Sequence, residues 1–431
     1  MSAHSAPHAP LGRVKGYLPR FADGELAVRL RATGAVLIEG PRGCGKTETA
    51  LRPARSAVRL DRDEQARAAG LVDPALLLDG PLPRLIDEWQ LVPRVWNQVR
   101  SDVDDHPDET GRFILAGSSV PADDETRHSG SLRFTRLRMR PMSLAESGYS
   151  TGDVSLAALF DGESPRAGDP GLTIRDLVER IAVGGWPALI GRSVDDALIA
   201  LRGYLDETRR ADLLRLDGVR RDPENVARVL RSLARHVATS ASARSIAADI
   251  GGADGPIDYH TVLEYTNALT RLFVTEDLPA WSPALRSRSA LRAAPTRHFV
   301  DPSLAVAALG TGPERLLKDV ETLGLLFESL VVRDLRIYAQ TIDANVLHYR
   351  EDSGLEADAI VERRDGNWAG FEVKLGQAAV DDAAKSLLRV AGRVDADRHG
   401  PPAALAVITG WGYAYRRPDG VAVIPVGALA P

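Results

Sequence analysis

Short apolar runs alternate with helix-like stretches along the first third of the chain. The runs are AVLI (35–38), RLI (84–86) and FILAG (113–117). Short uninterrupted apolar runs are typical of parallel strands that are buried on both faces, and apolar residues at spacings of three and four are typical of helices. The pattern therefore predicts an α/β domain built on a parallel sheet.

The pattern changes twice further along the chain. From about residue 172, apolar residues recur mainly at helical spacing, and from about residue 316 one long amphipathic helix is followed by strand-like runs. Polar breaks rich in glycine and proline separate these parts. A chain of 431 residues also exceeds what one hydrophobic core usually organises, so we expect two or three domains.

The composition narrows the class of protein further. The formal net charge is −5, so a nucleic-acid contact would need a local basic patch. Cys44 is the single cysteine and leaves no internal disulfide to form. No apolar run approaches the ~20 residues that span a bilayer, and the first residues lack the apolar core of a signal peptide. We expect a cytoplasmic protein with no membrane contact.

The stretch GPRGCGKT (40–47) carries the first candidate chemistry. It fits the pattern G-x-x-x-x-G-K-[ST], follows an apolar strand and precedes a helix, so backbone N–H groups would face a nucleotide phosphate. Lys46 would reach the β and γ phosphates, and Thr47 would bind Mg²⁺. The alternative is a glycine-rich turn that matches by chance. The expected ATP-binding residues are Gly40, Pro41, Arg42, Gly43, Cys44, Gly45, Lys46, Thr47, Glu48 and Ser118.

A second acidic element follows about forty residues later. PRLIDEWQ places Asp87 and Glu88 at the end of a short apolar strand. Asp87 would hold Mg²⁺ through water, and Glu88 would act as the general base for the attacking water. An isolated Asp-Glu pair is commonplace, so the prediction depends on the phosphate loop upstream.

Two further positions complete the expected catalytic site. The third apolar run ends at Gly117 and is followed by Ser118, whose hydroxyl could contact the γ phosphate; an ordinary turn is the alternative. The basic segment 131–140 supplies Arg133 as a candidate for stabilising transition-state charge, in cis or across a subunit contact. More often such a run is a solvated strand face.

These motifs occur in a recognisable order. GPRGCGKTETA, LIDEWQ, FILAGSS, RMRPMSLAESG and GGWPAL together resemble the prokaryotic AAA-type ATP-binding proteins that carry a C-terminal domain of unknown function. The resemblance implies an AAA-like P-loop ATPase core, a winged-helix-like segment and a restriction-endonuclease-like domain. We therefore expect a disordered N-terminus (1–12), an ATPase domain (13–150), a helical connector (151–214), a winged-helix-like domain (215–314) and a restriction-endonuclease-like domain (315–431).

The middle of the chain is the expected place for a nucleic-acid contact. The segment from SARSIAADIG to LPAW (242–281) has the length and periodicity of two helices and a short strand, as in a winged helix. Arg286, Arg288, Arg292 and Arg297 gather just after it and could hold a phosphate backbone. A solvated loop and a protein contact are the alternatives.

The last part of the chain carries a second set of candidate residues. Glu328 lies beside the apolar stripe of a long helix, Asp358 faces away from Ala357 and Ala359 on a predicted strand, and Glu372 and Lys374 form an E-x-K pattern on the next strand. Carboxylates so placed could hold Mg²⁺ for a nuclease. The pattern resembles the restriction-endonuclease-like superfamily. The alternative is a solvent-facing salt bridge.

The expected function is a Mg²⁺-dependent ATPase with an appended DNA-associated nuclease-like domain. The sequence also leaves open an ATP-regulated metal-dependent nuclease and a non-catalytic nucleotide-gated scaffold. The expected cofactors are ATP and Mg²⁺. DNA or another nucleic acid, and a further copy of the chain, are the candidate partners.

Overall fold

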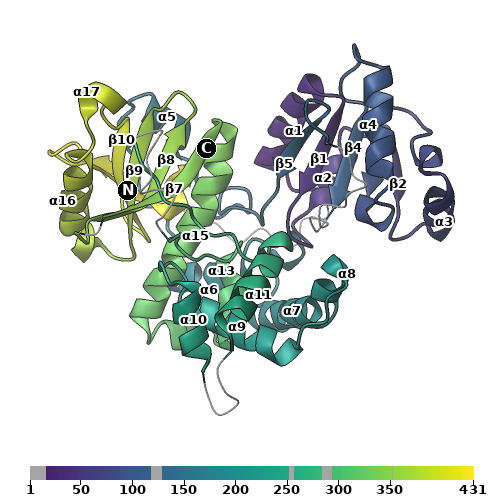
Figure 1. Cartoon of the computed structure of the whole chain (residues 1–431). Coiled ribbons are helices and arrows are strands. Elements are labelled where there is room, and N and C mark those ends of the chain that lie inside the picture. Colours follow the sequence, from purple (N-terminus) through teal and green to yellow (C-terminus); the bar gives the residue numbers. More distant parts are fainter. Residues whose placement is uncertain (1–15, 118–128, 252–256, 284–293, 352) are drawn as a thin grey trace, which may run out of the picture.

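The computed structural model describes residues 16–117, 129–251, 257–283, 294–351 and 353–431. Two α/β units stand on either side of a group of helices (Figure 1). The first unit is coloured purple to blue, the helices teal and green, and the second unit green to yellow. Within these residues no helix is both long enough and apolar enough to cross a membrane.

A five-stranded sheet forms the first unit. Its strands are β1 (Ala35–Glu39), β2 (Ser56–Arg59), β3 (Arg84–Asp87), β4 (Phe113–Gly117) and β5 (Phe134–Arg138). They lie in the order β2-β3-β4-β1-β5 with every pair parallel. The connecting helices are α1 (Phe21–Ala32), α2 (Lys46–Leu51), α3 (Glu64–Val72) and α4 (Val95–Asp105), with short 3₁₀ turns at η1 (Pro74–Leu77) and η2 (Trp89–Leu91). The predicted parallel sheet is confirmed.

Both faces of this sheet are covered. Along β1, Ala35 and Leu37 belong to a core with Trp96 of α4, whereas Val36 and Ile38 belong to a separate core with Leu26 of α1. Alternate residues of a strand point to opposite faces, so a sheet covered on both sides needs apolar residues at every position. This explains why the inner strands β1, β3 and β4 are apolar runs in the sequence, whereas the edge strands β2 and β5 carry polar residues.

The middle of the chain is helical. Its helices are α6 (Ile174–Val183), η3 (Pro187–Leu189), α7 (Val194–Glu207), the π-helical turn η4 (Thr208–Asp212), α8 (Leu213–Asp217), α9 (Pro223–Arg235), α10 (Ala243–Ile250), α11 (Tyr259–Arg271), α13 (Pro302–Leu309) and α14 (Pro313–Leu316). After α11, antiparallel bridges join Thr275 to Phe299 and Leu278 to Thr296. The predicted winged helix stays a prediction, because these bridges and helices do not by themselves establish that fold.

A six-stranded sheet forms the second unit. The long helix α15 (Val320–Thr341) precedes it. The strands are β7 (Ala344–Arg350), β8 (Glu356–Arg363), β9 (Trp368–Lys374), β10 (Ala404–Thr409), β11 (Tyr415–Arg416) and β12 (Ala422–Pro425), in the order β11-β12-β10-β9-β8-β7. Strands β7 to β9 are antiparallel, whereas β9, β10 and β12 are parallel. Helices α16 (Val380–Ala391) and α17 (Ala396–His399) and the turns η5 (Gln377–Ala379) and η6 (Val426–Ala428) complete it.

The segment after residue 150 departs from the expected helical connector. Strand β6 (Val154–Ser155) pairs with β13 (Leu429–Ala430) near the end of the chain, and α5 (Leu156–Phe160) follows it. Ala167 also bridges to Ala414. This stretch therefore packs on the second α/β unit, a long-range pairing that has no local signal in the sequence.

The helix α15 touches all three parts of the molecule. Buried side chains from Leu144 through the middle helices to Leu429 form one continuous core around it. Near its end, Gln340 accepts a bond from Arg140 (2.9 Å) and donates to the carbonyl of Arg138 (3.0 Å) at the end of β5. One rigid helix therefore connects the two sheets.

Candidate active site

The phosphate loop joins β1 to α2 at the carboxyl edge of the first sheet. Gly43 and Gly45 have φ angles of 74° and 103°, in the left-handed region that side chains disfavour. Gly40 has no room for a side chain, because an added Cβ would lie 2.2 Å from the carbonyl oxygen of Met139. The motif therefore has glycine at the positions where the backbone conformation, or the lack of space for a side chain, requires it.

The remaining loop residues take up different positions. Cys44 is fully buried, with Sγ 4.0 Å from the carbonyl of Met139, so it fills space rather than presenting a thiol. Arg42 points outward to Asp212, at 2.7 Å. Pro41 is buried and Glu48 is exposed in the first turn of α2.

Lys46 is directed back along the loop. Its Nζ donates to the carbonyl oxygens of Gly40 and Pro41, both at 2.8 Å, and the side chain is 6% exposed. An ammonium held there lies over the concave side of the loop. It is therefore placed to reach a phosphate that the loop amides would bind.

Thr47 and Asp87 meet across the sheet edge. Thr47 Oγ1 donates to Asp87 at 2.9 Å from Oδ2 and 3.1 Å from Oδ1. Burial raises the pKa of Asp87, while the Thr47 hydrogen bond and the Arg59 guanidinium act in the opposite direction. A hydroxyl and a carboxylate at this spacing fit Mg²⁺, which usually binds through one or two protein oxygens, waters and substrate phosphates.

Glu88 follows directly in an unusual backbone conformation. Its φ and ψ are 54° and 42°, left-handed values that are uncommon for a residue with a side chain. Its carboxylate accepts a hydrogen bond from Gln90 Nε2. Gly117, at the end of β4, packs against Gln90 and Trp89. Ser118, the predicted phosphate contact, lies outside the described residues.

Arg133 lies at the wrong end of the sheet for the role expected in cis. It precedes Phe134, which pairs with Ala35 at the amino end of β1, whereas the phosphate loop leaves the carboxyl end. Its guanidinium instead pairs with Asp104 of α4 at 2.6 Å. The structure does not bring Arg133 to the phosphate loop. The alternation of β5 gave no indication of which strand end would face the nucleotide.

Arg20 holds the phosphate loop and was missed at the sequence level. It is 6% exposed and donates to the carbonyls of Cys44 and Arg140, both at 2.7 Å, and to Glu146 at 3.0 Å. The hydrogen bond from Arg20 to the Cys44 carbonyl holds one peptide group of the phosphate loop in place. The sequence offered only a single arginine fifteen residues before β1, because its partners are distant in the chain.

The turn at 184–187 also contacts the loop. A Cβ added to Gly43 would lie 3.9 Å from the ring of Trp186, and one added to Gly45 would lie 3.7 Å from Pro187. Trp186 Nε1 donates to Ser303, and the Gly185 amide donates to Asp301, both at 3.0 Å. The contact of this turn with the phosphate loop was not predicted.

The four C-terminal candidate residues converge. Lys374 Nζ lies 2.6 Å from Glu372 and 3.3 Å from Asp358, and Asp358 accepts a bond from the Val373 amide at 2.7 Å. Burial, and then the charge of Asp358, raise the pKa of Glu372 to about 8 and hold that of Glu328 well above its ordinary value. Glu328, from α15, therefore faces the same cluster.

These side chains do not have the arrangement of a metal site. Over the described ranges, no group of three or more His, Cys, Asp or Glu side chains is placed to hold a metal ion. The Lys374 ammonium is bonded to Asp358 and Glu372 instead. The expected Mg²⁺ site in this domain is therefore not supported by the geometry.

The basic patch expected in the middle segment is only partly described. Arg286, Arg288 and Arg292 lie outside the described residues. Arg297 pairs with Asp277 and donates to the carbonyl of Ala241 at 2.9 Å. Arg297 is therefore engaged within the fold.

Family models match three separate parts of the chain. Residues 32–148 match a model described as an AAA domain. Residues 174–315 and 323–429 each match a model described as a domain of unknown function. No curated protein matches the chain.

Two solved structures show low overall similarity. One is the Walker-type ATPase PABY2304 of Pyrococcus abyssi, at 13% identity and a TM-score of 0.42 over 70% of this chain and 98% of that one. The other is the STAND protein PH0952 of Pyrococcus horikoshii, which has a tetratricopeptide repeat sensor, at 13% identity and a TM-score of 0.23 over 78% of this chain and 51% of that one.

The family match and the loop geometry support the same broad class. The match at 32–148 covers the sheet and the phosphate loop. It supports an AAA-type ATP-binding unit for this part of the chain and gives a coarse indication of ATPase activity. The matches at 174–315 and 323–429 assign no activity to those parts.

Proposed function

We propose that this chain binds ATP with Mg²⁺ and hydrolyses it in the first α/β unit. One observation carries the proposal: Thr47, which follows the phosphate-loop lysine, is bonded to Asp87 at the end of β3 at 2.9 Å. A metal-binding hydroxyl and an acid side by side at the edge of a parallel sheet are what a P-loop nucleotide site requires.

The residues divide the work of phosphate binding. The amides of the loop and of the first turn of α2 would bind the phosphates, and Lys46 would neutralise charge on the β and γ phosphates. Thr47 and Asp87 would hold Mg²⁺, and the ion would neutralise negative charge that develops on the phosphates. Arg20 would keep the loop in shape through Cys44.

Glu88 would activate the water. In hydrolysis the water oxygen forms a bond to the γ phosphorus, and the bond from that phosphorus to the β,γ-bridging oxygen breaks, so that ADP leaves with the electron pair. Glu88 would take the proton that the water loses. Its left-handed backbone turns the side chain away from the strand direction, and strained conformations of this kind cluster at functional sites.

Nucleotide binding is the direct test of this proposal. Calorimetric titration of the full chain with ATP in Mg²⁺ buffer should give binding that Lys46→Ala weakens at least ~10-fold, because a charge-assisted contact is lost. Arg31→Ala, on the exposed side of α1, is the matched control. Equal affinity in the Lys46 variant and the wild type would contradict the proposal.

We propose a second function, phosphodiester cleavage by the last unit, because of one observation. Side chains from β8 and β9 converge: Lys374 Nζ lies 2.6 Å from Glu372 and 3.3 Å from Asp358. The described geometry does not fit a metal, so no metal step is derived. Incubation of DNA and RNA with the wild type, Asp358→Ala and Lys374→Ala tests it; cleavage that persists in both variants would sink the assignment.

A further inference from the structure

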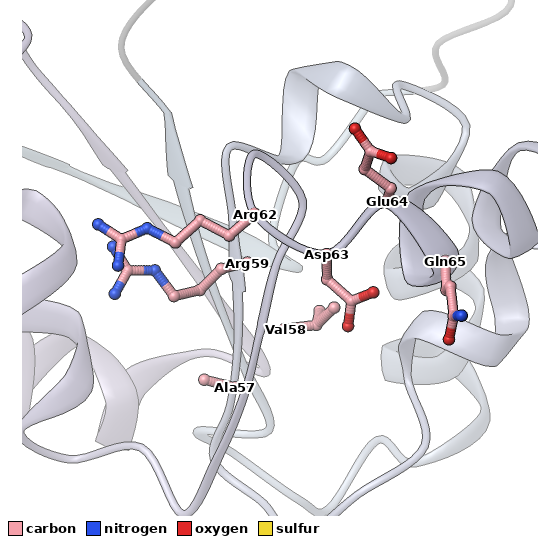
Figure 2. Close-up of a pocket in the computed structure, with 7 residues that line it drawn as sticks. All are labelled: Ala57, Val58, Arg59, Arg62, Asp63, Glu64 and Gln65. Atoms are coloured by element: carbon pink, nitrogen blue, oxygen red, sulfur yellow. The ribbon is translucent and has the colours of Figure 1, made fainter.

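A hollow of about 600 Å³ lies at the β2 edge of the first sheet. Its lining includes Arg59 and Arg62, with Asp63 and Glu64 on another side (Figure 2). Arg59 ends β2 and pairs in register with Asp87 of β3. The hollow therefore adjoins the carboxyl edge of a parallel sheet, where ligands bind in open α/β folds.

Arg59 is tied to the predicted metal site through one carboxylate oxygen. Asp87 Oδ2 lies 2.9 Å from Thr47 Oγ1 and 3.6 Å from Arg59 Nε. A ligand held by Arg59 would consequently lie beside the phosphate and metal site. Thr47, directly after the phosphate loop, and Arg59 therefore approach the same oxygen of Asp87.

The two guanidinium groups are placed for an anion. Arg59 and Arg62 both line the hollow, and Figure 2 shows them extending in the same direction across the view. Arg59 Nε is buried and makes no hydrogen bond to any described residue. The ion pair of Arg62 with the neighbouring Asp61 is long, at 3.8 Å. Adjacent like charges repel, and an unsatisfied buried donor is costly, so an oxyanion between the two groups would relieve both effects.

The acidic residues of the hollow are already engaged. Asp63 caps α3 by accepting a bond from the Ala66 amide at 2.8 Å. Glu64 lies 4.0 Å from Arg67 on the same helix. These contacts hold the two carboxylates on the α3 side. On the other side of the hollow, Arg59 and Arg62 make long ion pairs, with Asp87 at 3.6 Å and with Asp61 at 3.8 Å.

We propose that Arg59 and Arg62 form an oxyanion subsite that receives the phosphate released from ATP. The inference rests on the proposed ATPase function. It extends that function by assigning the released phosphate a binding place beside Asp87. Bidentate guanidinium groups match the geometry of phosphate oxygens. A phosphate group carried by a phosphorylated molecule has the same chemistry, and the experiment separates the two sources.

Direct binding of inorganic phosphate tests the subsite. The full chain is titrated with inorganic phosphate in a calorimeter without nucleotide, as wild type, Arg59→Gln, Arg62→Gln and Lys46→Ala. Loss of a charge-assisted bond should weaken binding about 10-fold in each arginine variant. Lys46→Ala removes phosphate binding at the phosphate loop, so the binding that remains in this variant should depend on Arg59, whereas the control Arg31→Gln, on the exposed side of α1, should bind within about twofold of wild type.

Two results would overturn the subsite. If Lys46→Ala abolishes phosphate binding while Arg59→Gln leaves it unchanged, the phosphate lies in the phosphate loop. If the wild type binds no phosphate, the subsite does not exist. Thermal unfolding of each variant shows whether a loss reflects folding; both arginines are partly exposed, so we expect melting temperatures close to wild type.

A further arm separates the two sources of phosphate. Phosphoserine should bind at least ~10-fold more weakly than inorganic phosphate if the subsite receives the released product, because the ester replaces the P–OH hydrogen-bond donor of hydrogen phosphate with a bulkier group while the three charged oxygens stay the same. Tighter binding of phosphoserine would overturn the assignment to released phosphate. Absence of ATP hydrolysis, measured separately, would contradict the proposed function. Phosphate binding that does not depend on Arg59 would contradict the subsite alone.

Discussion

Thr47 donates a hydrogen bond to Asp87 at 2.9 Å, although β4 lies between the strands that lead to them. Thr47 begins α2 directly after the loop that leaves β1, and Asp87 is the last residue of β3. Parallel strands end at the same edge, so residues that follow two of them can meet without a local sequence signal. This contact supports the proposal that Asp87 belongs to the nucleotide site.

Replacement of Glu88 by Gln should separate hydrolysis from binding. The amide cannot take the proton of the attacking water, so we expect phosphate release to fall by ~100-fold or more while ATP affinity changes by less than about threefold. Phosphate release and calorimetric ATP binding are measured on the same preparation. Hydrolysis that survives in this variant would show that another group is the base.

Replacement of Arg20 by Gln should weaken ATP binding more than it slows turnover. The change removes the charged donor to the Cys44 carbonyl. We expect KM for ATP to rise about 10-fold and kcat to change little, with partial recovery in Arg20→Lys. Pairing the change with Glu146→Gln avoids leaving the buried Glu146 charge without its partner.

A fall in kcat at unchanged KM would contradict this positioning role for Arg20. Arg29→Gln is the matched control, because Arg29 also belongs to the α1 region but pairs with Glu25 at 3.0 Å near the surface. We expect that variant to hydrolyse ATP as the wild type does.

Replacement of Asp301 by Asn should destabilise the whole molecule. Asp301 is fully buried, lies 2.8 Å from Arg333 and accepts a bond from the Gly185 amide. Removing one charge from a buried pair costs about 3 kcal/mol, and Arg333 keeps Asp334 at 2.7 Å. If the chain unfolds as one unit, we expect the melting temperature to fall by about 3 °C.

The exposed ion pair of Arg175 and Glu314 is the control for the effect of burial on the Asp301 pair. It has a similar separation of 2.7 Å but lies at the surface. Glu314→Gln should therefore change the free energy of unfolding by less than about 1 kcal/mol. Similar losses in Asp301→Asn and Glu314→Gln would show that burial of the Asp301 pair has no special effect.

Replacement of Glu372 by Gln should change how stability depends on pH. Burial and Asp358 raise the pKa of Glu372 from 4.5 to about 8. Between these values the folded state keeps a proton that the unfolded state releases, so this group's contribution to stability falls as pH rises. As pH rises, the free energy of unfolding of the wild type should therefore fall relative to that of the Gln variant, by up to about 1.4 kcal/mol per pH unit.

Urea unfolding of both proteins at about pH 5.5 and about pH 7.5 measures this difference. Asp382→Asn, on the exposed side of α16, serves as the control. An unchanged difference between wild type and Glu372→Gln at the two pH values would show that Glu372 is not held protonated in the folded state.

The sequence predicted the parts of the site that are local. The phosphate loop and the strand before Asp87 are continuous patterns, and strand alternation placed Asp358 opposite Ala357 and Ala359. In β8, Ala357 and Ala359 are buried while Glu356 is exposed, as the alternation predicts. Periodicity alone was therefore enough to predict which way these side chains face.

The other features of the site and the fold depend on contacts between segments that are distant in the sequence. Arg20 reaches Cys44 and Glu146, and Trp186 reaches the loop, only because the chain folds back on itself. Arg133 does not reach the phosphate loop in cis because β5 begins at Phe134, which puts Arg133 at the amino end of the parallel sheet. The pairing of β6 with β13 spans most of the chain and has no sequence signature.

Phosphate release from ATP by the wild type and Lys46→Ala, in Mg²⁺ buffer, tests the ATPase proposal most directly. Lys46 is held over the phosphate loop by Gly40 and Pro41. Hydrolysis by the wild type with a loss of roughly 100-fold or more in the variant is the predicted result. Equal release by both proteins, or none by a folded wild type that binds ATP, would contradict the proposal.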